Sequence, residues 1–158
     1  MLTATSSPRA LAHLPSVFVY GGIEEQVQVY DVQNTKWSTL PRPPHYSESG
    51  AAIIRNQFTL IGGRDTRRIP TNDLVTWTGK EWKVLYPPMH TARAFPSVLA
   101  FGDLVIVSGG GGADDLVYTI EVLDVNKRVW IQSNLKLPRP LSNHHMSLCG
   151  EYLSLIHI

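Results

Sequence analysis

Apolar residues along this chain gather in short runs of about five positions, bounded by glycine, proline and polar turn residues. No stretch shows the 3.6-residue apolar spacing of an amphipathic helix, so the runs predict β-strands. Three runs end in a glycine pair, at Val17–Gly22, Phe58–Gly63 and Val105–Gly110. A glycine pair after a strand allows positive φ or a close approach to a neighbouring backbone. The pattern therefore predicts an all-β repeat protein.

Further strands follow each glycine pair in a similar order, ending with one that holds a tryptophan. The expected strands are Val27–Asp31, one at Trp37, Gly50–Ile54, Leu74–Trp77, one at Trp82, Ser97–Phe101, Tyr118–Val125 and one at Trp130. The anchors that recur are Gly21, Gly22, Trp37, Gly62, Gly63, Trp82, Gly109, Gly110 and Trp130. Four short strands in each repeat of about 40 to 50 residues are typical of a propeller blade.

These anchors resemble the kelch repeat: a strand ending in two glycines, Tyr30 before Trp37, and a Leu-Pro-x-Pro segment at Leu40–Pro43 and again at Leu137–Pro140. The resemblance implies a partial kelch-type β-propeller of about three four-stranded blades from a larger ring, with the glycine-pair strand as an inner strand. The position of Tyr30 holds Val75 and Leu123 in the other repeats, which is usual for a degenerate repeat.

The expected organisation is an unstructured lead-in at 1–15, repeats at about 16–56, 57–103 and 104–152, and a non-native tail at 153–158. A fourth glycine pair is expected at positions 157 and 158, where His157 and Ile158 stand instead. Residues 153–158 resemble a translated sequencing-library adapter, which predicts that the chain is a fragment. Open sheet edges in such a fragment predict poor solubility or an open array.

Composition narrows the class of protein and its compartment. The net charge of +1 provides no field for nucleic acid or an anionic membrane, and no apolar run is long enough to cross a bilayer. Cys149 is the single cysteine, which excludes an internal disulfide and favours a reducing, cytoplasmic location. As a small apolar residue, Cys149 is expected to be buried.

No motif for catalysis, a cofactor or a metal is found, so the chain is not expected to be an enzyme. Gly109–Gly112 lacks the third glycine of a dinucleotide loop, because Asp114 stands there. The histidines lack metal-ligand spacing. His45, His90 and His144 lie in comparable loops and are expected to be polar loop residues. The alternative is a galactose-oxidase-like copper-radical oxidase, a class that occurs on the same fold.

The loops are the remaining candidates for function, because loops on a rigid scaffold are where such folds bind. The kelch arrangement implies that loops after the glycine pairs and loops after the Leu-Pro segments share one face. Arg64, Arg67 and Arg68 form a dense basic cluster in the longest of these loops. Arginine is suited to bidentate capture of carboxylates, so acidic peptide segments are the expected ligands. The alternative is that these arginines are only solvated.

Three further arginines recur once in each repeat: Arg42, Arg93 and Arg139. They are expected either to contact the partner or to hold neighbouring blades together. The predicted function is therefore protein–protein recognition without catalysis. The resemblance implies a ubiquitin-ligase substrate adaptor, or an actin-binding or scaffold protein.

Overall fold

A computed structural model of the chain describes residues 9–21, 26–44, 47–150 and 152–156, all of them in strands, turns and loops. This part of the chain forms four antiparallel sheets, three with four strands and one with two. The prediction of an all-β chain built from four-stranded units is confirmed. Across these described ranges, we find no helix with the length and apolar character needed to cross a membrane.

Each four-stranded sheet is a simple meander in which consecutive strands pair. The first sheet contains β1 (Arg9–His13), β2 (Ser16–Tyr20), β3 (Gln28–Asp31) and β4 (Lys36–Thr39). The second contains β5 (Gly50–Ile54), β6 (Gln57–Ile61), β7 (Leu74–Trp77) and β8 (Trp82–Lys83). The third contains β9 (Ser97–Phe101), β10 (Leu104–Ser108), β11 (Thr119–Asp124) and β12 (Val129–Lys136). The last pairs β13 (His145–Cys149) with β14 (Tyr152–Ile156).

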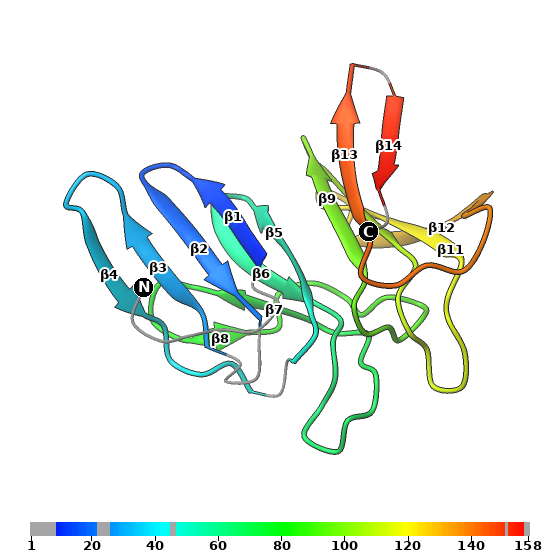
Figure 1. The fold of residues 1–158 in the computed structure, drawn as a ribbon, viewed down its shortest axis with the longest axis horizontal. Helices are drawn as coiled ribbons and strands as arrows, with labels where there is room; N and C mark the ends of the chain where they lie inside the picture. Colours follow the sequence, from blue (N-terminus) through cyan, green and yellow to red (C-terminus); the bar gives the residue numbers. More distant parts are fainter. Residues whose placement is uncertain (1–8, 22–25, 45–46, 151, 157–158) are drawn as a thin grey trace.

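The first strands of successive sheets lie next to one another: β5 contacts both β1 and β9, and β9 also contacts β13. The sheets therefore follow one another side by side around these strands (Figure 1). The glycine pairs follow β2, β6 and β10, the second strand of each sheet. They therefore mark an inner strand of each four-stranded sheet, as expected, while the first strand is the one that contacts the neighbouring sheets.

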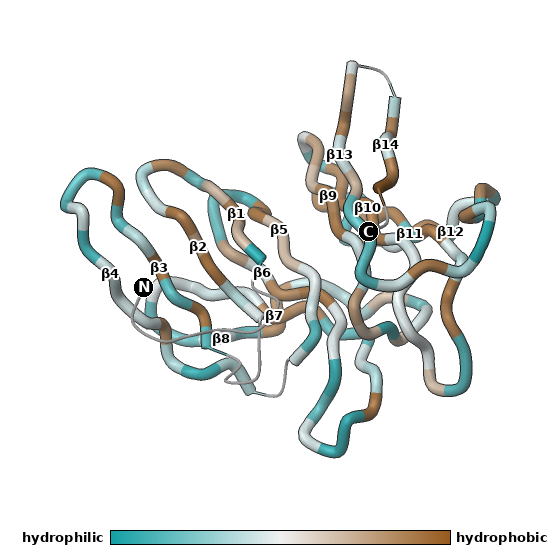
Figure 2. The backbone as a smooth tube through the Cα atoms, viewed as in Figure 1, coloured by the Kyte–Doolittle hydropathy of each residue, from teal (hydrophilic) through white to brown (hydrophobic). Residues whose placement is uncertain are grey.

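Apolar side chains fill the spaces between adjacent sheets. Phe18 of the first sheet stacks on Phe58 of the second at 4.6 Å between ring centroids, within a cluster that includes Tyr20 and Leu60. A larger cluster joins the second and third sheets through Ile61, Leu74, Val105, Val107 and Leu123. Burying a side chain of this size is worth about 1.5–3 kcal/mol. In Figure 2, hydrophobic stretches lie along strands of all the sheets, whereas the connections between strands are more hydrophilic.

The expected lead-in at 1–15 is wrong for Arg9–His13, which form β1 in register with β2. Residues 9–13 alternate between half-buried and exposed positions, as a strand with one covered face requires. The sheets therefore begin one strand earlier than the expected repeat boundaries. Residues 1–8 lie outside the described part of the chain.

The C-terminal segment continues the sheet pattern, because β14 pairs with β13 from His145↔Ile156 to Cys149↔Tyr152. An adapter origin for 153–158 stays a prediction, and the expected glycine-pair positions 157 and 158 lie outside the described residues. Cys149 is exposed at the end of β13, so the expectation of a buried cysteine is wrong.

Candidate partner-binding face

Two classes of loop emerge at the same end of the sheets in the described residues: the loops after β6 and β10, and the segments that join one sheet to the next (Figure 1). The meander requires this, because the β1–β2 and β3–β4 turns and their equivalents occupy the opposite end. Isolated bridges join the two classes, Ser47 with Arg64 and Ala94 with Gly111. We call this end of the sheets the loop face.

The glycine pairs allow neighbouring segments to pack closely at the loop face. Gly62 and Gly109 have φ values of +61° and +59°, in the left-handed region that favours glycine. A Cβ at Gly62 would lie 2.5 Å from the Arg93 carbonyl oxygen. The next N–H, that of Gly63, donates to the same oxygen at 2.9 Å. The anchor Gly22 lies outside the described residues.

The tryptophan anchors connect neighbouring sheets. Trp82 Nε1 donates to the Pro41 carbonyl at 2.7 Å, and Trp130 Nε1 donates to the Pro87 carbonyl at 2.8 Å. In both cases the acceptor lies in the segment that leaves the preceding sheet. The third anchor, Trp37, packs on Tyr30 of its own sheet, with 5.0 Å between ring centroids. Trp82 and Trp130 therefore fix the spacing of adjacent sheets.

The loop 64–70 is a compact turn organised by Asp65. Its carboxylate accepts the Arg67 N–H at 2.9 Å and the Ile69 N–H at 2.8 Å, and its own N–H donates to the Ile69 carbonyl. The pKa of Asp65 lies below its ordinary value, mainly because of the hydrogen bond from Ile69, with Arg67 acting in the same direction and burial opposing it. An ionised Asp65 therefore keeps the turn in this conformation.

The three arginines of this loop differ in how available they are. Arg64 is half-buried, with Nε 2.5 Å from a Glu48 carboxylate oxygen and Nη1 donating to the Arg68 carbonyl. Arg67 is 78 % exposed and contacts Asp65 at 3.3 Å. Arg68 is exposed and has a φ of +63°. Arg64 thus supports the loop, whereas Arg67 and Arg68 project their charge from it.

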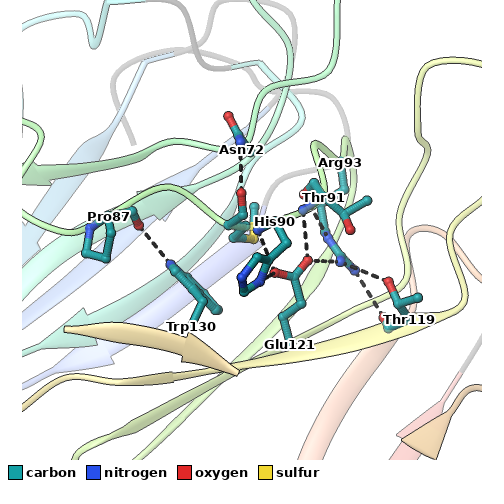
Figure 3. A network of polar contacts seen from close by, with 9 residues as sticks. Asn72, Pro87, His90, Thr91, Arg93, Thr119, Glu121 and Trp130 are labelled. Carbon is teal, nitrogen blue, oxygen red and sulfur yellow. Dashed lines mark hydrogen bonds and ion pairs between the residues drawn. The ribbon is translucent and has the colours of Figure 1, made fainter. Parts of the chain in front are cut away.

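Arg93 is completely buried, so its predicted use as a partner-contacting side chain is wrong. Its guanidinium donates to the Thr119 carbonyl at 3.1 Å and to Glu121 at 2.5 Å (Figure 3). It also donates to the Gly109 carbonyl at 3.0 Å. These acceptors lie on or beside β10 and β11. The guanidinium thus anchors the segment 89–96 to the third sheet, and a role of this arginine in holding neighbouring blades together stays a prediction.

Glu121 also holds the segment 89–96 in place. It is fully buried and accepts the His90 N–H at 2.7 Å, the Thr91 N–H at 3.1 Å and a contact from His90 Nδ1 at 3.0 Å. Burial alone raises the pKa of Glu121, but the His90 N–H and the Arg93 guanidinium outweigh it, so that pKa lies below its ordinary value. Glu121 therefore remains ionised at neutral pH and fixes the segment to β11.

Sequence reasoning missed Glu121, although a signal was present. Glu121 alternates in phase with the buried Leu123 and Val125, so a charged residue stands on the covered face of a strand. A carboxylate at such a position needs a cation, because an unpaired buried charge is too costly. That requirement points to an arginine such as Arg93.

The remaining predicted residues are spread over the loop face. Arg42 and Arg139 are exposed, in the segments that follow β4 and β12. The structure therefore gathers Arg64, Arg67 and Arg68 in one loop and leaves Arg42 and Arg139 beside other sheets.

The histidines occupy different environments. His90 is half exposed beside Glu121, whereas His144 is buried with Nε2 2.8 Å from the Ser108 hydroxyl. His45 lies outside the described residues. In the described ranges, no group of three or more histidine, cysteine, aspartate or glutamate side chains is placed to hold a metal ion.

A comparison of the chain with models of known protein families finds no match. The loop face is accordingly interpreted from its own residues.

Proposed function

We propose that this chain is part of a kelch-type β-propeller that binds a protein partner through the loop face, without catalysis. The proposal is supported by three successive four-stranded meanders, the recurring glycine pairs, and the tryptophan contacts that join the sheets. Loops held against such a scaffold are suited to recognition.

One observation carries the choice of ligand: Arg67 and Arg68 are exposed on a turn whose backbone is already fixed by Asp65. Fixing the loop before binding reduces the entropy lost when a partner is captured. An arginine guanidinium pairs with carboxylates through two parallel hydrogen bonds. The favoured ligand is an acidic peptide segment of a cytoplasmic protein, as for a ubiquitin-ligase substrate adaptor or an actin or scaffold binder.

The test uses the chain and a short fluorescent peptide in which glutamates surround a leucine. We expect Arg67→Ala combined with Arg68→Ala to weaken binding about tenfold, equal to about 1.4 kcal/mol. The matched control combines Lys36→Ala, at the start of β4, and Lys80→Ala, between β7 and β8, which removes two exposed charges at the opposite end of the sheets. The control is expected to bind like the unmodified chain.

Both double variants should unfold at the urea concentration of the unmodified chain, because the substituted side chains are exposed. Equal binding by the arginine variant and the unmodified chain would contradict the assignment of Arg67 and Arg68. If neither the unmodified chain nor either double variant binds the peptide, the proposed ligand class is contradicted.

A further inference from the structure

The last sheet has two strands, whereas the three sheets before it have four. β14 is the second strand of its sheet, as β2, β6 and β10 are of theirs. Each of those three pairs with a strand on both sides, but within the described residues β14 pairs with β13 alone. The five residues of β14, Tyr152–Ile156, include no charge and no proline, which are the usual means of keeping an edge strand from pairing. One edge of β14 is therefore open to a further strand.

The third sheet has a face that contacts β13 near the loop face and is exposed farther along the strands. The contact is made by Ser108, whose Oγ lies 3.1 Å from Met146 Sδ. Because side chains alternate along a strand, Leu104 shares the face of Ser108, and Phe101 lies opposite Leu104 on β9. Leu104 and Phe101 are both exposed, Phe101 to 57 %. We call the face that holds Ser108, Leu104 and Phe101 the outer face of the third sheet.

The second sheet shows how the same face is covered elsewhere in the chain. Ile54 ends β5 as Phe101 ends β9, but Ile54 is only 2 % exposed. The cluster in which Ile54 is buried includes Leu123 and Trp130, from the third and fourth strands of the following sheet. A third and a fourth strand are what the last sheet lacks among the described residues. Phe101 is exposed for that reason.

β14 shows the same difference from the opposite side. Leu153 and Leu155 have the same register with the first strand of their sheet as Val105 and Val107 have with β9. Val105 and Val107 are buried, whereas Leu153 and Leu155 are 37 % and 36 % exposed. By alternation along β13 and by cross-strand pairing, both leucines share the face of Met146, which contacts the third sheet. Apolar side chains are therefore exposed on both β14 and the outer face.

The tryptophan contacts indicate a further property of the absent strands. Trp82 and Trp130 lie on fourth strands, and each donates to a proline carbonyl in the segment that leaves the preceding sheet. For Trp82 that proline is Pro41, in a Leu-Pro-Arg-Pro segment. Pro138 has the same place in the second Leu-Pro-Arg-Pro segment, which follows β12, and it is exposed. A tryptophan on the fourth strand of a completed last sheet is expected to donate to the Pro138 carbonyl.

We propose that β14 and the outer face of the third sheet bind a two-stranded β-hairpin, which completes the last sheet. The first strand of the hairpin pairs with the free edge of β14, and apolar side chains of the hairpin cover Phe101 and Leu104. The second strand carries a tryptophan whose indole N–H donates to the Pro138 carbonyl. A second copy of the chain is a poor occupant, because every strand of this chain that holds a tryptophan already pairs within its own sheet. This surface differs from the loop face, so the inference does not depend on the acidic ligand proposed above.

The experiment measures binding of the full chain to a fluorescent peptide with the sequence of residues 27–39, which is the chain's own β3–β4 hairpin. The peptide is cyclised through an Asn-Gly turn to hold the hairpin, and its second strand contains Trp37. We expect the unmodified chain to bind this peptide. Trp37→Phe in the peptide should weaken binding about tenfold, because the hydrogen bond to Pro138 is lost. Binding should also slow hydrogen–deuterium exchange in β14, since its free edge becomes hydrogen-bonded.

Variants of the chain test the outer face. Phe101→Ser with Leu104→Ser should weaken binding of the peptide about tenfold, because apolar contacts are lost. The control combines Val32→Ser, after β3, with Val84→Ser, after β8; both valines are exposed, and the control should bind like the unmodified chain. Both double variants should keep the urea midpoint of the unmodified chain, because the substituted residues are exposed. The Trp37→Phe peptide tests the same inference without altering the chain.

Each other outcome overturns all or part of the inference. If the unmodified chain does not bind the hairpin peptide, the inference is wrong. Equal binding of the Trp37→Phe peptide overturns the contact with Pro138, and binding without slower exchange in β14 overturns pairing at that edge. Binding that is unchanged by Phe101→Ser with Leu104→Ser overturns the role of the outer face. A dimer in sedimentation that is broken by this double variant, and not by the control, identifies a second copy of the chain as the occupant and also overturns the inference.

Discussion

Two neighbouring segments of the loop face use arginine for opposite purposes. In the segment 89–96, Arg93 is buried and bonded to Glu121 and to two backbone carbonyls. In the loop 64–70, Arg67 and Arg68 are exposed, and the nearby Asp65 uses its carboxylate mainly to hold backbone N–H groups. The role of an arginine here is decided by whether the adjoining sheet offers a buried carboxylate.

The contrast also shows how a binding loop is supported. Arg93 and Glu121 fix a segment that passes between loops 64–70 and 111–116, through the hydrogen bonds of Gly63 and Gly111. The buried pair therefore positions the exposed loops without contacting a partner itself.

The largest expected effect comes from breaking the buried pair. Glu121→Ala leaves the Arg93 guanidinium buried without its carboxylate, and removing one partner of such a pair costs about 3–5 kcal/mol. Urea unfolding followed by tryptophan fluorescence measures the loss. Replacing both residues, with Arg93→Met and Glu121→Leu, should restore part of it, because no unpaired charge remains. A loss under about 1 kcal/mol for Glu121→Ala would place the pair among ordinary surface ion pairs.

A smaller loss of stability is expected from a substitution at Gly62, which packs against the segment 89–96 that contains Arg93. Gly62→Ala places a methyl group 2.5 Å from the Arg93 carbonyl oxygen in a residue with a φ of +61°. Gly102→Ala has nearly the same φ, +57°, but its methyl group would meet nothing within 4 Å. The left-handed backbone costs each variant about 1–2 kcal/mol. Gly62→Ala should lose clearly more stability in urea, and equal losses would show that the close approach to Arg93 is unimportant.

The smallest effect is the dependence of stability on pH that Glu121 contributes. The pKa of Glu121 is lower in the folded chain than its ordinary value. The contribution of its ionised form to the free energy of unfolding is therefore complete above a pH of about 4.3, and it is lost as the pH falls through the folded pKa. Glu121→Gln cannot ionise. The difference in urea midpoint between Glu121→Gln and the unmodified chain should therefore narrow as the solution is made acidic. A difference that stays constant from neutral to acidic pH would contradict an ionised Glu121.

Much of the fold could be predicted, because its signals are local. The strands Gly50–Ile54, Leu74–Trp77 and Ser97–Phe101 have the predicted bounds, since glycine, proline and polar turns delimit them. β1 was missed, because Arg9–His13 carries no glycine pair and its strand character depends on pairing with β2. That the sheets are blades of a kelch-type β-propeller stays a prediction.

The candidate site could be predicted less well, because its arrangement depends on contacts between distant parts of the chain. The cluster in loop 64–70 is visible in sequence, but Arg64 is held by Glu48 from the preceding connection. Arg93 is buried because Glu121 meets it from β11. Loop composition alone does not distinguish a supporting arginine from an exposed one.

The most direct test of the loop face is hydrogen–deuterium exchange of the chain with and without the leucine-containing acidic peptide. The account predicts that the peptide slows exchange in loop 64–70, while the turns 32–35 and 78–81 at the opposite end of the sheets are unaffected. Slower exchange confined to those turns, or unchanged exchange in loop 64–70 at saturating peptide, would contradict it.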